Sequence, residues 1–217
     1  MGAKPIKKRG KPTQQVGCVF LTGRTIFHLT VEETRMKALK STVAALVTAA
    51  FVAGPVCAGA RDHQFASIDG GFVDMADWAG QPVLVVNTAS QCGFTGQYAG
   101  LQELYDTYRA AGLVVFAVPS DDFNQELGSA EEVKEFCEMN FGLDLPMADI
   151  TRIRGKNAHP FYQDVRAETG FVPRWNFNKV LIGPDGEIVD TWGSQTKPMS
   201  REITDAVETL LDQASQG

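Results

Sequence analysis

The sequence predicts an α/β domain in which helices cover both faces of a central mixed β-sheet. Two continuous, β-branched apolar runs, at 83–89 and 113–119, are typical of strands buried in the middle of a sheet. A segment with apolar residues at helical spacing lies between them. A second helix, a strand hairpin and a closing helix follow, and this alternation of elements predicts the α/β class.

The first half of the domain begins with a small hairpin over 65–74, because Asp69-Gly70-Gly71 supplies its turn. The first buried strand, 83–89, comes next. A helix follows this strand and ends at Gly112, since glycine is common just past a helix end. The second buried strand, 113–119, comes directly afterwards. The apolar residues of the helix recur at helical spacing and are Tyr98, Leu101, Leu104, Tyr105 and Tyr108.

The second half begins with a helix whose start is marked by Ser129 and Glu132, the spacing of a capping box. The segment Gly183-Pro184-Asp185-Gly186 is a strong hairpin signal between two short strands. The remaining elements are expected at 158–168 (helix), 179–182 and 187–191 (strands) and 200–213 (helix). This order of elements matches a thioredoxin-like fold.

The first 60 residues differ in composition from the rest of the chain. They hold nine of the 20 Lys and Arg residues but only two of the 26 acidic ones. From Met36 the chain reads as a short basic segment, an apolar segment and small residues at Ala58 and Ala60, which is the pattern of a secretory signal peptide. We therefore expect 1–35 to be an upstream extension that is unstructured or not translated, 36–60 to be a signal peptide cleaved after Ala60, and 61–217 to be one periplasmic domain. A buried helix of a first domain is the alternative.

The charge of the mature part excludes some classes of partner. Residues 61–217 hold 11 basic and 24 acidic residues, a net charge of −13, which would repel nucleic acid and anionic lipid. No apolar run approaches the ~18–20 residues that a transmembrane helix needs, so stable membrane insertion is not expected.

The cysteines give the first indication of chemistry. Cys18 and Cys57 fall in the predicted leader, so the mature part keeps Cys92 and Cys137, which could form one structural disulfide. Cys92, however, lies just beyond a buried strand and before a helix. A helix N-terminus offers unpaired N–H groups and a partial positive charge, and both stabilise a thiolate. Cys92 is therefore a candidate nucleophile, with an inert buried cysteine as the alternative.

The residues around Cys92 limit the classes of reaction that its thiol could perform. Thr95 stands where a dithiol oxidoreductase has its second cysteine, so no resolving partner is adjacent. His63 and His159 lie in no catalytic motif, and His159 is more typical of a helix start than of a base. The Cys and His residues share no metal-ligand spacing, so neither a metal nor another cofactor is expected. A lone activated thiol suits attack on the weak O–O bond of a hydroperoxide.

The segment NTASQCGFT (Asn87–Thr95) resembles the active-site loop of the glutathione peroxidase family in its cysteine form. Three further segments resemble that family in order, and the resemblance extends from Phe65 to the C-terminus. They are VPSDDFNQELGS (118–129), NAHPFY (157–162) and WNFNKVLIGPDG (175–186).

The resemblance implies a thioredoxin-like fold and a peroxidase whose catalytic residues are Cys92, Gln125, Trp175 and Asn176. The last three would act as neutral hydrogen-bond donors to the thiolate and to the departing hydroxide. The thiolate would attack a hydroperoxide and become a sulfenic acid, which a second thiol reduces. Hydroperoxides and a thiol reductant, either a thioredoxin-like protein or glutathione, are therefore the expected partners.

The chain departs from the family pattern at two places. The second motif is one residue shorter than in many members, and Ser120 replaces its usual cysteine. Cys137 lies one position before the resolving cysteine of thioredoxin-dependent members, and one position on a helix is about 100° of rotation. Cys137 is thus a possible resolving thiol or a buried structural one.

The short segment Gly170–Arg174 bears on assembly and substrate. By resemblance, a short segment here implies a monomer with an open site for bulky organic or lipid hydroperoxides. The acidic surface disfavours anionic glutathione as the reductant. A thiol–disulfide redox protein without peroxidase activity and a non-enzymatic binding module are the competing hypotheses.

Overall fold

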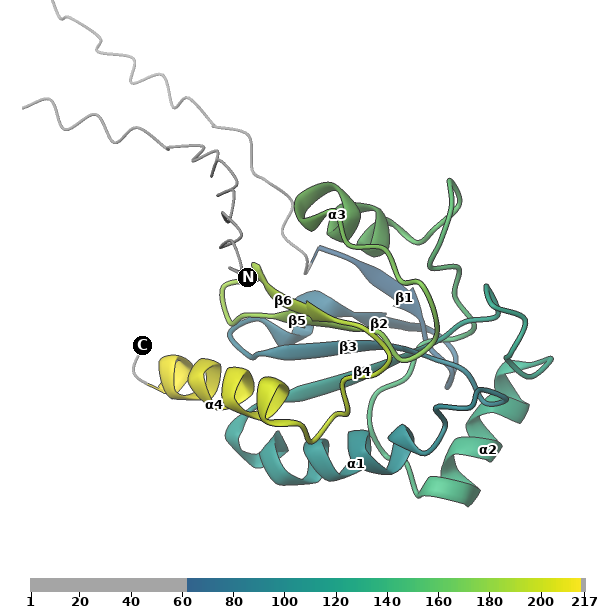
Figure 1. Ribbon diagram of the computed structural model, residues 1–217, viewed down its shortest axis with the longest axis horizontal. Helices are drawn as coiled ribbons and strands as arrows, with labels where there is room; N and C mark the ends of the chain where they lie inside the picture. Colours follow the sequence, from purple (N-terminus) through teal and green to yellow (C-terminus); the bar gives the residue numbers. More distant parts are fainter. Residues whose placement is uncertain (1–61, 216–217) are drawn as a thin grey trace, which may run out of the picture. The chain divides into compact units, whose positions relative to one another are not determined.

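The computed structural model describes residues 62–215 (Figure 1). The predicted extension, the signal peptide and its cleavage point lie outside the described residues, as do Cys18 and Cys57. In the described part, no helix has the length and apolar character needed to cross a membrane.

A four-stranded sheet with the order β4-β3-β5-β6 forms the centre of the domain. β3 and β4 are parallel, whereas β5 is antiparallel to both of its neighbours, so the predicted mixed sheet is confirmed. The strands are β3 (Val83–Thr88), β4 (Val114–Pro119), β5 (Lys179–Ile182) and β6 (Ile188–Trp192).

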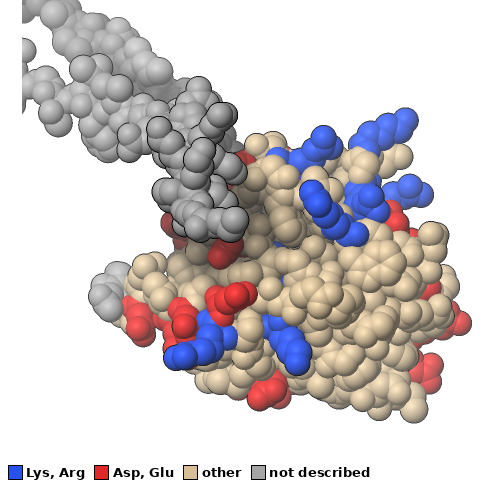
Figure 2. Space-filling model, in the orientation of Figure 1, with Lys and Arg blue, Asp and Glu red and all other residues tan. Residues whose placement is uncertain are grey.

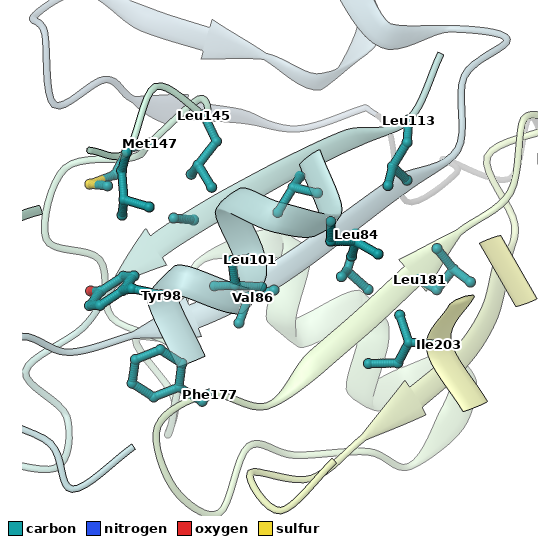
Figure 3. Packing of buried hydrophobic residues seen from close by; sticks show 14 of the residues in the cluster. Leu84, Val86, Tyr98, Leu101, Leu113, Leu145, Met147, Phe177, Leu181 and Ile203 are labelled. Carbon is teal, nitrogen blue, oxygen red and sulfur yellow. The ribbon is translucent and has the colours of Figure 1, made fainter. Parts of the chain in front are cut away.

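Helices cover both faces of this sheet, because successive residues of a strand point to opposite sides. Leu84 and Val86 of β3 belong to one core with residues of α1 (Gln97–Tyr108), α2 (Ala130–Phe141) and α4 (Arg201–Ser215). Figure 3 shows Tyr98 and Leu101 of α1 beside Val86 of the sheet. Val83 and Val85 belong to a second core with residues of α3 (Pro160–Thr169). The predicted α/β, thioredoxin-like arrangement is confirmed.

The predicted hairpin near the start of the domain is present as β1 (Gln64–Ala66) paired with β2 (Phe72–Asp74). Gly70 and Gly71 in its turn have φ values of 84° and 74°, which explains the need for glycine there. A short 3-10 helix, η1 (Met75–Trp78), follows and has no counterpart among the predictions; Asp74 caps it by accepting from the Ala76 N–H.

The helices begin and end at the capping and glycine residues that mark them in the sequence. α1 continues into a 3-10 turn, η2 (Arg109–Ala111), and ends at Gly112, whose φ is 109°. Ser129 Oγ accepts from the Glu132 N–H at 3.3 Å, so the predicted start of α2 is confirmed. The Glu132 carboxylate accepts from the Gly128 N–H at 3.0 Å and not from the Ser129 N–H of a regular capping box.

Candidate active site

Three segments meet at one edge of the sheet. The carboxyl ends of the parallel strands β3 and β4 lie together there, so the loops that follow them are neighbours. The Gln91 N–H donates to the Gln125 carbonyl at 2.9 Å and joins these two loops. The antiparallel β5 begins at the same edge, where the Phe177 N–H donates to the Asn87 carbonyl at 2.6 Å. Topology therefore brings the predicted site motifs together.

Cys92 lies in the loop between β3 and α1 and is 4% exposed. Its Sγ accepts a hydrogen bond from the Phe94 N–H at 3.4 Å, and the Thr95 N–H donates to the Cys92 carbonyl at 3.1 Å. The thiol therefore accepts one backbone hydrogen bond and lies in a turn just ahead of a helix. Cys92 is as buried as an inert core cysteine would be. Its hydrogen bond from the Phe94 N–H, however, is an interaction that apolar packing alone does not provide.

Gln125 and Asn176 are in direct contact. Asn176 is fully buried, and its Nδ2 donates to Gln125 Oε1 at 3.0 Å. With its oxygen engaged, the Gln125 amide presents its NH₂ group as a donor. Asn176 Oδ1 is buried and has no hydrogen-bond partner among the described residues. Such a pair can hold amide donors in place without adding charge.

Trp175 has its backbone anchored and its ring at the surface. Its carbonyl accepts from Asn87 Nδ2 at 3.0 Å and also from Asn178 Nδ2. The side chain is 40% exposed, and its ring centroid lies 5.3 Å from that of Phe123. Trp175 and Phe94, two residues after Cys92, line a common pocket of about 460 Å³. This pocket is large enough for an organic group attached to a reacting oxygen.

The side chains of Gln125 and Asn176 are thus in direct contact, and a backbone hydrogen bond connects the Cys92 loop to Gln125. Trp175 and Phe94 of the Cys92 loop line the same pocket. The catalytic role of these four residues stays a prediction. His159, which the sequence indicated as a helix-start residue, caps α3 by accepting from the Phe161 N–H at 3.3 Å.

Glu126 is a buried carboxyl group that the sequence gave no reason to expect. Its Oε1 accepts from the Ser90 N–H at 2.8 Å and from the Leu127 N–H at 2.9 Å. Its Oε2 is buried without a hydrogen-bond partner among the described residues. Burial raises the pKa of this carboxyl group, although the hydrogen bonds from Ser90 and Leu127 oppose the shift. Glu126 therefore fixes the loop before Cys92 to the loop that carries Gln125.

Cys137 lies in α2 and is 1% exposed, in the same apolar core as Cys92. Burial is the main cause that raises the pKa of its thiol to about 12. Neither cysteine is in a disulfide. In this conformation Cys137 is a protonated core thiol, and a resolving role would require α2 to unwind.

Lys179, in the motif after Trp175, is fully buried. Its Nζ donates to Gln97 Oε1 and to the Thr196 carbonyl, both at 2.6 Å. It therefore joins the first residue of α1 to the loop after β6. Because burial penalises the charged form, the pKa of Lys179 is lowered to about 7.

The lowered pKa of Lys179 predicts that the free energy of unfolding depends on pH. Between pH 7 and the ordinary lysine pKa of about 10.4, the unfolded chain keeps the proton of Lys179 whereas the folded chain loses it. The free energy of unfolding should therefore rise with pH over this window, by at most about 1.4 kcal/mol per pH unit from this group. Lys179→Met should lose that contribution, which urea unfolding at several pH values between neutrality and mild alkalinity would measure. The exposed Lys197→Met is the matched control and should keep the wild-type slope. Equal slopes in wild type and Lys179→Met would contradict the prediction.

Comparison with known proteins identifies the family of the chain. A family model described as "Glutathione peroxidase" matches residues 61–166. The glutathione peroxidase of Lactococcus lactis is 38% identical over 156 residues, which cover 69% of this chain and 98% of that protein. The "Hydroperoxy fatty acid reductase gpx1" of Synechocystis is 38% identical over 156 residues, covering 67% of this chain and 91% of that protein. The crystal structure of T. cruzi GPX1 superimposes with a TM-score of 0.56 at 27% identity, over 71% of this chain and 97% of that one. The chain therefore belongs to the glutathione peroxidase family and is a peroxidase.

Proposed function

We propose that this chain is an exported thiol peroxidase that reduces hydrogen peroxide and organic or lipid hydroperoxides through the thiolate of Cys92. The observation that carries this proposal is the meeting of three segments at one sheet edge. There, Asn176 holds the Gln125 amide at 3.0 Å, and the Gln125 backbone holds the Cys92 loop.

The residues suggest the following steps. The Cys92 thiolate attacks one oxygen of ROOH, so that an S–O bond forms as the O–O bond breaks. The departing RO⁻ takes a proton and leaves as ROH, or as water when the substrate is hydrogen peroxide, and Cys92 becomes a sulfenic acid. The Gln125 amide and the indole N–H of Trp175 stabilise the negative charge that develops on the leaving oxygen.

Reduction of the sulfenic acid needs two thiols. The first attacks the Cys92 sulfur, forms a mixed disulfide and releases water; the second releases the Cys92 thiol and leaves a disulfide in the reductant. Cys137 is a poor first thiol in the described conformation because it is buried and its pKa is raised to about 12. We therefore favour an external thiol for this step.

The nature of the reductant follows from charge. Residues 61–217 carry a net charge of −13, which disfavours the approach of anionic glutathione. A thioredoxin-like protein with two thiols also completes both reduction steps by itself. We therefore favour such a protein over glutathione.

The segment between α3 and β5 bears on substrate size and assembly. α3 ends at Thr169, and only a short segment separates it from Trp175 at the pocket. A short segment here supports a monomer with an open site. The name of the Synechocystis relative, a hydroperoxy fatty acid reductase, supports lipid hydroperoxides as substrates.

Export is proposed from the sequence pattern at 36–60 alone. The mature protein should begin at Arg61. Mass spectrometry of the protein recovered from the periplasm would test this, and a protein that keeps Met36 after secretion would contradict it.

A reductant assay tests the proposed function. Hydroperoxide loss would be followed with the full chain, either with thioredoxin and its reductase or with glutathione and its reductase. We expect turnover with thioredoxin to be at least about tenfold faster at equal thiol concentration, because one dithiol protein completes both reduction steps and the negative domain repels anionic glutathione. Cys137→Ser should keep this turnover if an external thiol reduces Cys92. Faster turnover with glutathione would contradict the choice of reductant, and disulfide exchange without peroxide loss would contradict peroxidase activity itself.

A further inference from the structure

The turn that carries Trp175 and Asn176 includes a bulky residue in the left-handed backbone region. Phe177 has a φ of 60°, which residues with a large side chain rarely adopt. Such a conformation persists only where surrounding contacts hold it. The Phe177 ring is fully buried, and its centroid lies 5.1 Å from that of the Tyr98 ring (Figure 3). Packing therefore holds the ring, and the backbone around it must be held by hydrogen bonds.

Side-chain donors hold the carbonyl groups of this turn. The Trp175 carbonyl accepts from Asn178 Nδ2. The Asn176 carbonyl accepts from Ser194 Oγ at 2.6 Å. Ser194 lies in the loop after β6, and its Oγ in turn accepts from Asn178 Nδ2 at 3.3 Å. The hydroxyl of Ser194 thus connects the loop after β6 to the backbone of a predicted catalytic residue.

Gln97, the first residue of α1, holds Ser194 from the other side. Its Nε2 donates to the Ser194 carbonyl at 2.6 Å, and its Oε1 accepts from Lys179 Nζ at 2.6 Å. Lys179 Nζ also donates to the Thr196 carbonyl. Because both neighbours of Nζ are oxygen atoms, the lysine is the donor in both contacts and fixes which end of the Gln97 amide is its oxygen. The NH₂ group of Gln97 is thereby directed at Ser194.

These contacts form a closed ring of hydrogen bonds, which we call the Lys179–Gln97–Ser194 bridge. Lys179 is fully buried, unlike the Lys and Arg side chains that project from the surface in Figure 2. A buried amine is costly unless acceptors surround it, and the bridge supplies them. Lys179 and Asn176 belong to the same short segment of chain, so the bridge leaves this segment at the lysine and returns to it at the Asn176 carbonyl.

The bridge also reaches the loop that contains Cys92. The Gln97 N–H donates to the Phe94 carbonyl in that loop at 2.8 Å. At the other end, Asn176 holds the Gln125 amide at 3.0 Å. The bridge therefore connects the proposed nucleophile to the donors that are proposed to act on the leaving oxygen. Stabilisation of a transition state by such donors depends steeply on their placement.

We propose that Gln97 and Ser194 are positioning residues of the peroxidase reaction. Their hydrogen bonds hold Trp175 and Asn176 in place relative to Cys92, so they act through these residues and not on the hydroperoxide. This inference rests on the proposed catalytic roles of the latter three residues and adds the side chains that keep them aligned. Breaking the bridge should slow the reaction of Cys92 with peroxide without abolishing it.

The variant Gln97→Glu separates positioning from stability. A glutamate keeps the oxygen that accepts from Lys179 and adds a negative charge beside that amine. It loses the NH₂ group, so the Ser194 carbonyl would face an oxygen. With the full, reduced chain, we expect the rate constant for loss of cumene hydroperoxide in a single turnover to fall about tenfold. The thermal midpoint should stay at or above that of the wild type.

The Ser194 hydroxyl is tested by a pair of variants. Ser194→Ala removes the donor to the Asn176 carbonyl and should lower the same rate constant about tenfold. Ser194→Thr keeps a hydroxyl group and should restore most of the wild-type rate. A residue that only stabilises the fold would not produce this pattern at an unchanged thermal midpoint.

Two controls match these substitutions. Gln163→Glu removes an amide that donates to the Ala158 carbonyl, also at 2.6 Å, but in α3. Ser200→Ala removes a hydroxyl that follows the same loop as Ser194 and has no hydrogen-bond partner among residues 62–215. Both controls should keep the wild-type rate constant.

A wild-type rate constant in Gln97→Glu or in Ser194→Ala would overturn the proposal. So would losses that follow the thermal midpoint equally in variants and controls. A wild-type chain that consumes no peroxide would contradict the proposed function instead, and hydrogen exchange would then test the bridge alone. The Phe177 amide, which donates to the Asn87 carbonyl, should exchange faster in Gln97→Glu than in Gln163→Glu, and equal exchange would overturn the positioning role.

Discussion

Cys92→Ser should lower kcat/KM for any hydroperoxide by at least about 10⁴-fold, because a serine hydroxyl is almost entirely protonated at neutral pH and is a far weaker nucleophile than a thiolate. The substitution removes only the sulfur from a turn whose backbone hydrogen bonds remain, such as that from the Thr95 N–H to the carbonyl of residue 92. The fold should therefore survive, and the loss should be one of chemistry. Hydroperoxide consumption with thioredoxin as reductant measures it.

Cys137→Ser is the matched control, since it also removes a buried sulfur from the same core. It should lower stability through the buried hydroxyl but should keep the rate of the first peroxide turnover. Activity in Cys92→Ser within tenfold of the wild type would mean that another group performs the attack.

Gln125→Ala should lower kcat by about 10²-fold, the usual cost of removing one preorganised donor from an active site. Asn176 Nδ2 holds the Gln125 amide at 3.0 Å, so its NH₂ group is positioned before substrate arrives. Gln125 is only partly buried, and its loss should change the thermal midpoint little. Steady-state kinetics and thermal unfolding of the same samples test both statements.

Asn176→Asp should lower kcat by more, about 10³-fold, because it replaces the donor to Gln125 by an oxygen and adds a charge at a fully buried position. Gln102→Ala is the control for both variants. It removes a partly buried glutamine of α1 whose amide bonds to Asp106 and Asp144, away from the site. A loss in Gln102→Ala equal to that in Gln125→Ala would assign the effect to general destabilisation.

The local elements of the fold could be predicted because their signals lie within a few residues. Every residue of β3 and β4 is buried, as their continuous apolar runs predict. Gly112 ends its helix with a positive φ, and Ser129 caps the next one, as their residue types require. η1 begins after the capping residue Asp74, and a single capping aspartate is too weak a pattern to predict a short 3-10 helix.

The identity of the site residues could be predicted from the sequence, but the contacts between them could not. Asn176 and Gln125 are 51 positions apart, and no local pattern pairs them. Lys179 is buried because its Nζ finds oxygen atoms on Gln97, 82 positions away, and Thr196, 17 positions away, whereas a lone lysine in a sequence suggests an exposed residue. The burial of Glu126 likewise depends on a distant partner, because its Oε1 accepts from the Ser90 N–H, 36 positions away. The burial of a charged group depends on distant partners, which one sequence does not reveal.

A single turnover of the reduced protein distinguishes a peroxidatic Cys92 from an inert one. The fully reduced full chain would be mixed with one equivalent of cumene hydroperoxide, and peroxide loss would be followed before the cysteine-containing peptides are analysed by mass spectrometry. We predict that the peroxide disappears, that the Cys92 peptide gains one oxygen atom, trapped as an adduct by a sulfenic-acid reagent, and that the Cys137 peptide is unchanged. A Cys92–Cys137 disulfide would keep the peroxidase claim but contradict reduction by an external thiol. Peroxide that persists while both thiols remain intact would contradict the claim that Cys92 is a peroxidatic nucleophile.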